Sequence, residues 1–182
     1  MFSRGRAFDV VGAAGGLVFF APVMIAIAAA ILLDDGGPIL FHQTRLGRGR
    51  RPFEILKFRS MRGGRITRVG RALRATGLDE LPQFLNILRG DLSAVGPRPV
   101  TADDAVRYAP FPDAEVRWSV NPGLTGLAQL AGRTLEESVA LDRAYVRDRS
   151  VLLDCRMIAM SFVVNVLGKS RARRLFFPAA SG

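Results

Sequence analysis

Residues that build disulfides and zinc sites are nearly missing from this sequence. Cys155 is the only cysteine and His42 the only histidine among 182 residues. An internal disulfide is therefore excluded, and so is a zinc site made of histidines and cysteines. A catalytic metal would need oxygen ligands, which suits Mg²⁺. The single cysteine also fits a reducing compartment.

Acidic residues are scarce as well. The chain has 16 Asp and Glu against 26 Lys and Arg, which gives a formal net charge of +10. This excess indicates an anionic partner: a phosphate-bearing ligand, an acidic lipid surface or nucleic acid. Nucleic acid is disfavoured, because aromatic residues are not interleaved with the basic ones and because it leaves a long apolar run unexplained.

Charged residues are absent from Val10 to Leu33. As a straight helix this run would measure roughly 36 Å, longer than the roughly 30 Å hydrocarbon core of a bilayer. Pro22, near the midpoint, removes a backbone hydrogen bond and clashes with the preceding turn. Arginines flank the run on both sides, and the positive-inside rule would hold both flanks in the cytoplasm. We therefore favour a re-entrant helix over about residues 8–34, broken at Pro22, rather than a single proline-kinked span.

The remaining residues, 35–182, contain no internal repeat and no linker. We therefore expect residues 1–182 to form a single domain, an α+β fold that is mainly helical with a small β-hairpin. The hairpin is predicted from two short strands, 38–43 and 53–61, on either side of a glycine-rich turn. Lys57 and Arg59, two residues apart on the second strand, would point to one face.

Two helices are predicted around Gly77. A basic ridge that recurs at every third residue up to Arg74 lies on the first helix, which Gly77 ends. The second helix is predicted to begin with Asp79 as its N-cap and to end at Gly90. Its buried stripe is predicted to be Leu81, Phe84, Leu85 and Leu88.

A glycine-punctuated loop, 121–133, and an apolar helix, 152–167, make up much of the C-terminal part. Basic residues follow the helix at positions 169–174. The helix could lie flat on a membrane with its basic tail near acidic headgroups. It could equally be a buried core helix with a solvated tail, and both interpretations stay open.

Asp79 and Glu80 are adjacent acids at a predicted helix N-terminus. Capping alone explains most such pairs. Here the helix dipole would also favour an ionised carboxylate and a phosphate nearby. Lys57, Arg74 and Arg98 fall on predicted rigid elements and could surround the pair as an anion cradle. Composition and spacing do not define the reaction.

Five short motifs follow one another in a fixed order. They are Lys57-Phe58-Arg59-Ser60-Met61, Leu78-Asp79-Glu80-Leu81-Pro82-Gln83, Gly90-Asp91-Leu92-Ser93, Gly96-Pro97-Arg98-Pro99, and Pro122-Gly123-Leu124-Thr125-Gly126 with Gln129. In this order they resemble the bacterial sugar transferases, the monotopic polyprenyl-phosphate phosphoglycosyl transferases. The resemblance runs from about residue 6 to residue 167. Nothing large precedes the membrane segment, so the chain resembles a minimal member with only the catalytic domain.

The resemblance implies a two-step transfer from a UDP-sugar to undecaprenyl phosphate. The aspartate matching Asp79 would attack the β-phosphate and release UMP, and the phosphosugar would then pass to the lipid phosphate. The acid matching Glu80 would assist, and Mg²⁺ would be required beside Asp79. This reaction is a first membrane step of glycoconjugate biosynthesis.

The resemblance also implies further site residues and a location. Lys57, Arg59, Arg74, Arg98 and Gln129 would bind the substrates, with Arg98 holding the nucleotide or a phosphate. The membrane segment would be re-entrant, on the cytoplasmic face of the bacterial inner membrane and in contact with its lipids. The sequence carries no signal of oligomeric state, so a homo-oligomer stays open.

Two other functions compete with this interpretation. In a non-enzymatic basic protein that binds acidic lipids at the membrane surface, Asp79 and Glu80 would be dispensable. In a membrane phosphatase or diphosphate hydrolase the acceptor would be water, so UMP release would not depend on a polyprenyl phosphate.

Overall fold

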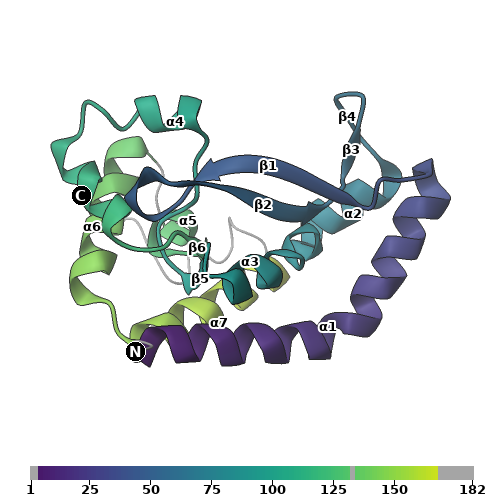
Figure 1. The fold of residues 1–182 in the computed structure, drawn as a ribbon, viewed down its shortest axis with the longest axis horizontal. Helices are drawn as coiled ribbons and strands as arrows, with labels where there is room; N and C mark the ends of the chain where they lie inside the picture. The colour runs from purple at the N-terminus through teal and green to yellow at the C-terminus, as the bar shows by residue number, and fades with distance from the viewer. Residues whose placement is uncertain (1–3, 132–133, 168–182) are drawn as a thin grey trace.

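The computed structural model describes residues 4–131 and 134–167, which are mainly helical with small pairs of strands, as predicted. Figure 1 shows α1 running along one edge of the molecule and turning up a second edge, with the β1–β2 hairpin across the opposite side. The elements are α1 (Arg4–Asp35), β1 (Leu40–Leu46), η1 (Arg48–Arg50), β2 (Pro52–Phe58), β3 (Met61–Arg62), β4 (Arg65–Ile66), α2 (Arg68–Thr76), η2 (Leu78–Glu80), α3 (Gln83–Arg89), β5 (Ser93–Val95), α4 (Ala102–Val106), η3 (Pro112–Ser119), β6 (Gly123–Thr125), α5 (Leu127–Ala131), α6 (Leu135–Asp148) and α7 (Val151–Leu167).

Within the described residues, α1 is the one helix whose length and apolar composition would let it cross a membrane. Its helical structure continues through Pro22, so the predicted interruption is absent. Figure 1 shows that α1 instead bends, so that its two halves run in different directions. A proline inside a helix is a common cause of such a bend, because its ring crowds the preceding turn and one hydrogen bond is lost.

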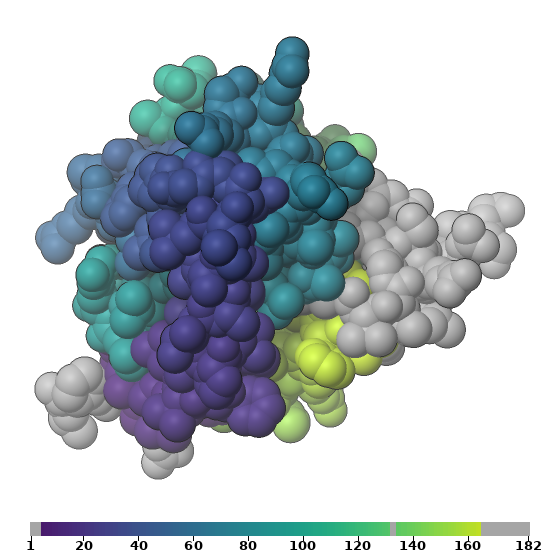
Figure 2. All heavy atoms as spheres, turned by 90° about the vertical axis from the view of Figure 1, so that its right-hand side faces the viewer, coloured from purple at the N-terminus to yellow at the C-terminus, as the bar shows by residue number. Residues whose placement is uncertain are grey.

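Much of the apolar surface of α1 is uncovered. Leu33 is 88% exposed, Val18 78% and Phe19 75%. Figure 2 shows α1 along the middle of one face with no other described element over it. On its inner side Ile27 and Ile31 pack in a core cluster. An apolar helix that is so little covered is compatible with monotopic membrane association.

Both ends of α1 are attached to the same folded body. Near the first end, Arg6 donates to the last carbonyls of α3, and Asp9 Oδ1 accepts a 2.9 Å hydrogen bond from the Ala94 N–H of β5. At the other end Asp35 forms an ion pair with Arg59, just beyond β2. The two ends of α1 therefore lie against one unit of structure.

The predicted hairpin is confirmed, with shifted ends. β1 and β2 pair antiparallel, with Leu40 opposite Phe58. The first strand begins later than predicted, after Pro38, which has no N–H to contribute to the ladder. The second strand ends at Phe58, so Arg59 lies outside it.

The prediction that Asp79 caps an α-helix was wrong. Gly77 ends α2 as predicted, in a left-handed conformation with φ of 73°. The chain then makes the single 3-10 turn η2, and Asp79 lies in the middle of that turn. The following α-helix, α3, begins only at Gln83, with Pro82 at its N-cap position, and ends at Gly90 as predicted.

The buried side of α3 also differs from the predicted stripe. Asn86 and Ile87 are 0% and 1% exposed. Asn86 faces β2, where its Oδ1 accepts from the Leu56 N–H at 2.9 Å and its Nδ2 donates to the Glu54 carbonyl at 2.7 Å. A polar residue is therefore buried because it pairs with a strand edge. Of the predicted stripe Leu81 is buried, whereas Phe84, Leu85 and Leu88 are only half-buried.

The predicted loop 121–133 contains two elements, β6 and α5. β6 pairs in parallel with β5. Hydrogen bonds of 2.9 Å from the Gly123 N–H to the Pro97 carbonyl, and from the Gly96 N–H to the Thr125 carbonyl, continue the contact. A Cβ atom at Gly96 or Gly123 would collide with the opposing backbone. Glycine at both positions therefore allows the close approach.

The predicted C-terminal helix is confirmed as α7. Met157 and Val164 belong to a core cluster, whereas Leu152 and Phe162 are exposed. The helix therefore has one buried and one exposed apolar side, so it is a core helix along part of its surface. Its basic continuation, 169–174, lies outside the described residues.

Candidate active site

A cavity of about 510 Å³, here called the main cavity, collects most of the predicted site residues. Its lining comes from β2, α2, η2, β6, α5, α7 and the segment after β5. The predicted residues that line it are Lys57, Arg74, Asp79, Glu80, Arg98 and Gln129. They are far apart in the sequence, so the fold brings them together.

Asp79 and Glu80 lie side by side on η2, directly after the left-handed Gly77 that turns the chain away from α2. Both residues are half-buried. Burial raises the pKa of Asp79 and the neighbouring Glu80 raises it further, whereas Lys57, a backbone hydrogen bond and Arg74 lower it. A carboxylate with a perturbed pKa in a cationic cavity is a candidate for chemistry.

The two carboxylates have different partners. Lys57 Nζ lies 2.6 Å from Glu80 Oε1, whereas Asp79 forms no ion pair with the residues that the structure describes. Lys57 is held in place through β2, because the preceding residue, Leu56, donates its N–H to Asn86. Glu80 is therefore fixed by an ion pair, and Asp79 remains available to a ligand.

Arg98 presents an exposed side chain from a fixed backbone. Its carbonyl accepts a 2.7 Å hydrogen bond from Arg117 Nη2. Arg117 is 3% exposed, its guanidinium lies 3.8 Å from the ring centre of Tyr108, and it pairs with Asp142 at 3.7 Å. Burial raises the pKa of Asp142 to about 6 although Arg117 opposes the shift. No sequence pattern indicated that Arg117 and Asp142 would support Arg98 from the interior.

Arg74 and Arg59 have different positions. Arg74, in the last turn of α2, lines the main cavity, with its Nη1 3.1 Å from Met61 Sδ. Arg59 does not line this cavity. It pairs with Asp35 and donates to the Gly37 carbonyl at 2.6 Å, so it attaches the end of α1 to the body. The structure therefore does not bring Arg59 into the cluster expected from the sequence.

A narrower extension, here called the inner cleft, shares Lys57, Glu80 and Arg98 with the main cavity. Arg45 and Gln83 also line it. Burial and the nearby Arg98 lower the pKa of Arg45, whereas Asp104 raises it. Neither Arg45 nor Gln83 was predicted to belong to the site, although Gln83 closes one of the five motifs.

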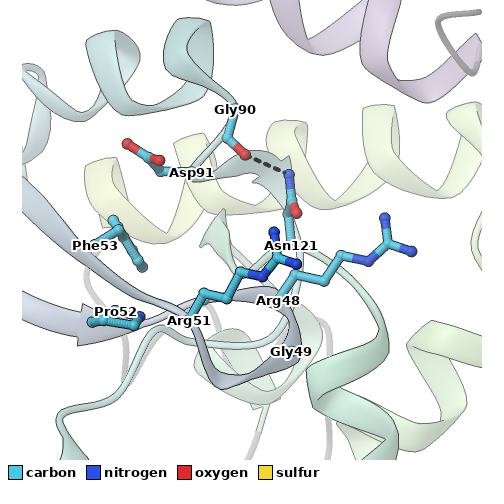
Figure 3. A pocket seen from close by; sticks show the side chains of 9 residues that line it. Arg48, Gly49, Arg51, Pro52, Phe53, Gly90, Asp91 and Asn121 are labelled. Atoms are coloured by element: carbon cyan, nitrogen blue, oxygen red, sulfur yellow. Dashed lines mark hydrogen bonds between the residues drawn. The ribbon is translucent and has the colours of Figure 1, made fainter.

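Another cavity, of about 570 Å³, lies at the hairpin turn, and within residues 4–131 and 134–167 it shares no lining residue with the main cavity. Figure 3 shows Arg48 and Arg51 beside Asn121, whose side chain donates to the Gly90 carbonyl at 2.9 Å. Among the described residues, Asp91 is the one carboxylate of its lining. Without a carboxylate pair this cavity does not offer the chemistry of the main cavity, in spite of its size.

The carboxylate pair suits one kind of metal. Among the described residues no group of three or more His, Cys, Asp or Glu could hold a metal ion. Mg²⁺ does not need three protein ligands, because it is usually held by one or two carboxylates together with waters and substrate phosphates. Asp79 and Glu80 at a cationic cavity fit that requirement.

The fold and the site define a class of protein: one with a long apolar helix compatible with membrane association and a cationic cavity that holds a carboxylate pair. The family model for bacterial sugar transferases matches residues 2–168. The chain belongs to this family, as the motifs predicted, and is a transferase.

Three curated relatives illustrate the similarity. The UDP-glucose:undecaprenyl-phosphate glucose-1-phosphate transferase of Caulobacter vibrioides is 44% identical over 178 residues, 85% of this chain and 67% of that protein. The exopolysaccharide production protein PSS of Rhizobium leguminosarum is 37% identical, over 84% of this chain and 90% of that protein. The UDP-N-acetylgalactosamine-undecaprenyl-phosphate N-acetylgalactosaminephosphotransferase of Aeromonas hydrophila is 36% identical, over 84% of this chain and 41% of that protein. The chain thus spans less than half the length of some relatives.

Proposed function

We propose that this protein transfers a phosphosugar from a UDP-sugar to undecaprenyl phosphate and releases UMP. The observation that carries the proposal is the arrangement of Asp79 and Glu80 with Lys57, Arg74 and Arg98 around one cavity. The names of the relatives support the same donor and acceptor classes. The product would be a lipid diphosphosugar, the starting point of a polysaccharide or other glycoconjugate.

In the first step an oxygen of the Asp79 carboxylate attacks the β-phosphorus of the donor. The bond from that phosphorus to the bridging oxygen breaks, UMP leaves with that oxygen, and the phosphosugar becomes attached to Asp79. In the second step a phosphate oxygen of undecaprenyl phosphate attacks the same phosphorus and releases the Asp79 carboxylate. Such a covalent route divides one difficult transfer into two easier ones.

Electrostatics explains why the cations are needed. A carboxylate that approaches a diphosphate is repelled by about 4 kcal/mol per charge pair at 4 Å, for an effective dielectric constant near 20. Arg74 and Arg98 offset this repulsion and stabilise the charge that develops during transfer. Lys57 neutralises Glu80, which would otherwise add to the repulsion.

Mg²⁺ would be held by Asp79, with Glu80 adjacent, and would supply charge neutralisation at the donor phosphates. The residues of the chain perform the remaining tasks. Asp79 provides the attacking oxygen, Glu80 and Lys57 fix the turn that carries it, and Arg98 orients a phosphate. Gln129, on the cavity wall, adds a hydrogen-bonding group for the donor.

The membrane arrangement is part of the proposal. α1 would be re-entrant, with both ends on the cytoplasmic face of the bacterial inner membrane. Two observations support this: α1 bends, and its two ends contact the same body through Arg6 and Asp35. The acceptor would keep its tail in the lipid and present its phosphate at headgroup height. Tags at residue 1 and after residue 45 should both be accessible from the cytoplasm, whereas a spanning helix would place residue 1 on the far side.

A turnover assay tests the proposed reaction. Purified protein in nanodiscs is incubated with Mg²⁺, undecaprenyl phosphate and a panel of UDP-sugars, and UMP is measured. We expect repeated turnover only with the acceptor, and at most one UMP per protein without it. Sustained UMP release without the acceptor would establish a hydrolase. The absence of release with every donor, under conditions where the protein is folded, would exclude the transferase proposal.

A further inference from the structure

Gln83 is a buried amide with an unused hydrogen-bond donor. It is the first residue of α3, it is 2% exposed, and it lines the inner cleft. Its Nε2 has no hydrogen-bond partner in residues 4–131 and 134–167. Most buried polar groups are hydrogen-bonded, so an unpaired donor at a cleft calls for an explanation.

Arg45, from β1, lines the same cleft and also has an unused donor. Its side chain is 17% exposed. Nη1 donates to the Pro99 carbonyl at 3.4 Å and Nη2 to Gln43 Oε1 at 2.6 Å. Nε is buried and has no partner within the described part of the chain. One carboxylate, Asp104, approaches Arg45 Nη1 at 3.9 Å from a half-exposed position.

The inner cleft therefore gathers donors with few acceptors to match them. Arg45, Gln83, Lys57 and Arg98 line it, and its carboxylate, Glu80, is already paired with Lys57 at 2.6 Å. Its free volume of about 10 Å³ corresponds to a single oxygen-sized group. A phosphoryl oxygen fits this space and this charge, whereas a nucleobase or a sugar is too large.

We infer that Arg45 and Gln83 bind an oxygen of one of the two donor phosphates. This is the phosphate that is not attacked and that leaves as part of UMP. The assignment follows from position, because Asp79 lines the main cavity but not the inner cleft. A phosphate oxygen held in the cleft leaves the second phosphate of the donor in the main cavity, toward Asp79. The inference deepens the proposed function and rests on its donor class.

The test uses the full chain in detergent with Mg²⁺ and three ligands: UMP, inorganic diphosphate and a UDP-sugar. The variants are Gln83→Leu and Arg45→Met, and the matched control is Arg107→Met, an exposed arginine that lines neither cavity. Dissociation constants for UMP and diphosphate, the KM for the UDP-sugar and the melting temperature are measured for each protein.

We expect Gln83→Leu and Arg45→Met to weaken UMP and diphosphate binding about tenfold and to raise the KM for the UDP-sugar. Arg107→Met should leave the two dissociation constants and this KM unchanged. Gln83→Leu should melt no lower than the original protein, because it removes an unpaired buried donor. Unchanged UMP binding in both variants would overturn the inference, even if diphosphate binding changed. If UMP and diphosphate bind as expected but no UDP-sugar turns over, the subsite stands and the proposed function fails.

Discussion

Asn86 connects α3 to β2, and its replacement by leucine should destabilise the protein strongly. In Asn86→Leu the Leu56 N–H and the Glu54 carbonyl lose their partners at 2.9 Å and 2.7 Å. Asn86 is fully buried, so water has no access to replace the lost bonds. Each unsatisfied buried group costs about 1–3 kcal/mol, and the added leucine packing offsets part of this cost. We expect a net loss of about 3 kcal/mol.

The melting temperature of the protein in detergent measures this loss. For a chain of this size about 3 kcal/mol corresponds to a decrease of roughly 6–12 °C. Asn121→Leu is the matched control, because Asn121 donates one 2.9 Å hydrogen bond and lines an open cavity where water can replace it. It should change the melting temperature by less than about 2 °C. If Asn86→Leu melted within that same margin, the argument that Asn86 holds β2 and Lys57 in place would be refuted.

Three further results are expected. In the proposed mechanism the ionised carboxylate of Asp79 attacks, and the pKa of Asp79 is raised, so turnover should fall as pH decreases, with a midpoint above 3.8. Lys57→Met should move this midpoint to higher pH, because it removes a charge that lowers the pKa of Asp79. A pH–rate profile without this shift would contradict the assignment. Burial raises the pKa of Asp142 from 3.8 to about 6. The protonated side chain therefore contributes stability that is present below about pH 4 and is lost as pH rises through 6, a change of about 3 kcal/mol. Melting curves of Asp142→Asn should depend less on pH in this window. Pro22→Leu should straighten α1 and make a tag at residue 1 inaccessible from the cytoplasm, and full accessibility would show that Pro22 does not set the topology.

Sequence patterns predicted the elements whose signals are local. Gly77 and Gly90 end helices as expected, because a left-handed glycine is a local C-terminal signal. The hairpin followed from its glycine-rich turn, and the order of the motifs predicted the family. The same motifs contain Asp79 and Arg98, which line one cavity in the structure. Composition and spacing alone did not define the reaction.

The errors arose where a distant contact decides the local structure. Asn86 is buried because it pairs with the edge of β2, and no helical periodicity of apolar residues can indicate that. Arg59 looked like a partner of Lys57 on one strand face, but the strand ends before it and Asp35 pairs with it. Arg45 was missed because the cleft that it lines is formed together with Gln83 and Arg98, which are distant in the sequence.

The central claim is that Asp79 becomes covalently attached to the phosphosugar, and the mass of the intact protein tests it most directly. Incubation with Mg²⁺ and a UDP-sugar accepted in the turnover assay, without undecaprenyl phosphate, should add the mass of one phosphosugar, which later addition of the acceptor removes. Asp79→Asn should melt like the original protein, show no added mass and release no UMP. Full turnover by Asp79→Asn, or the same added mass on that variant, would contradict the account.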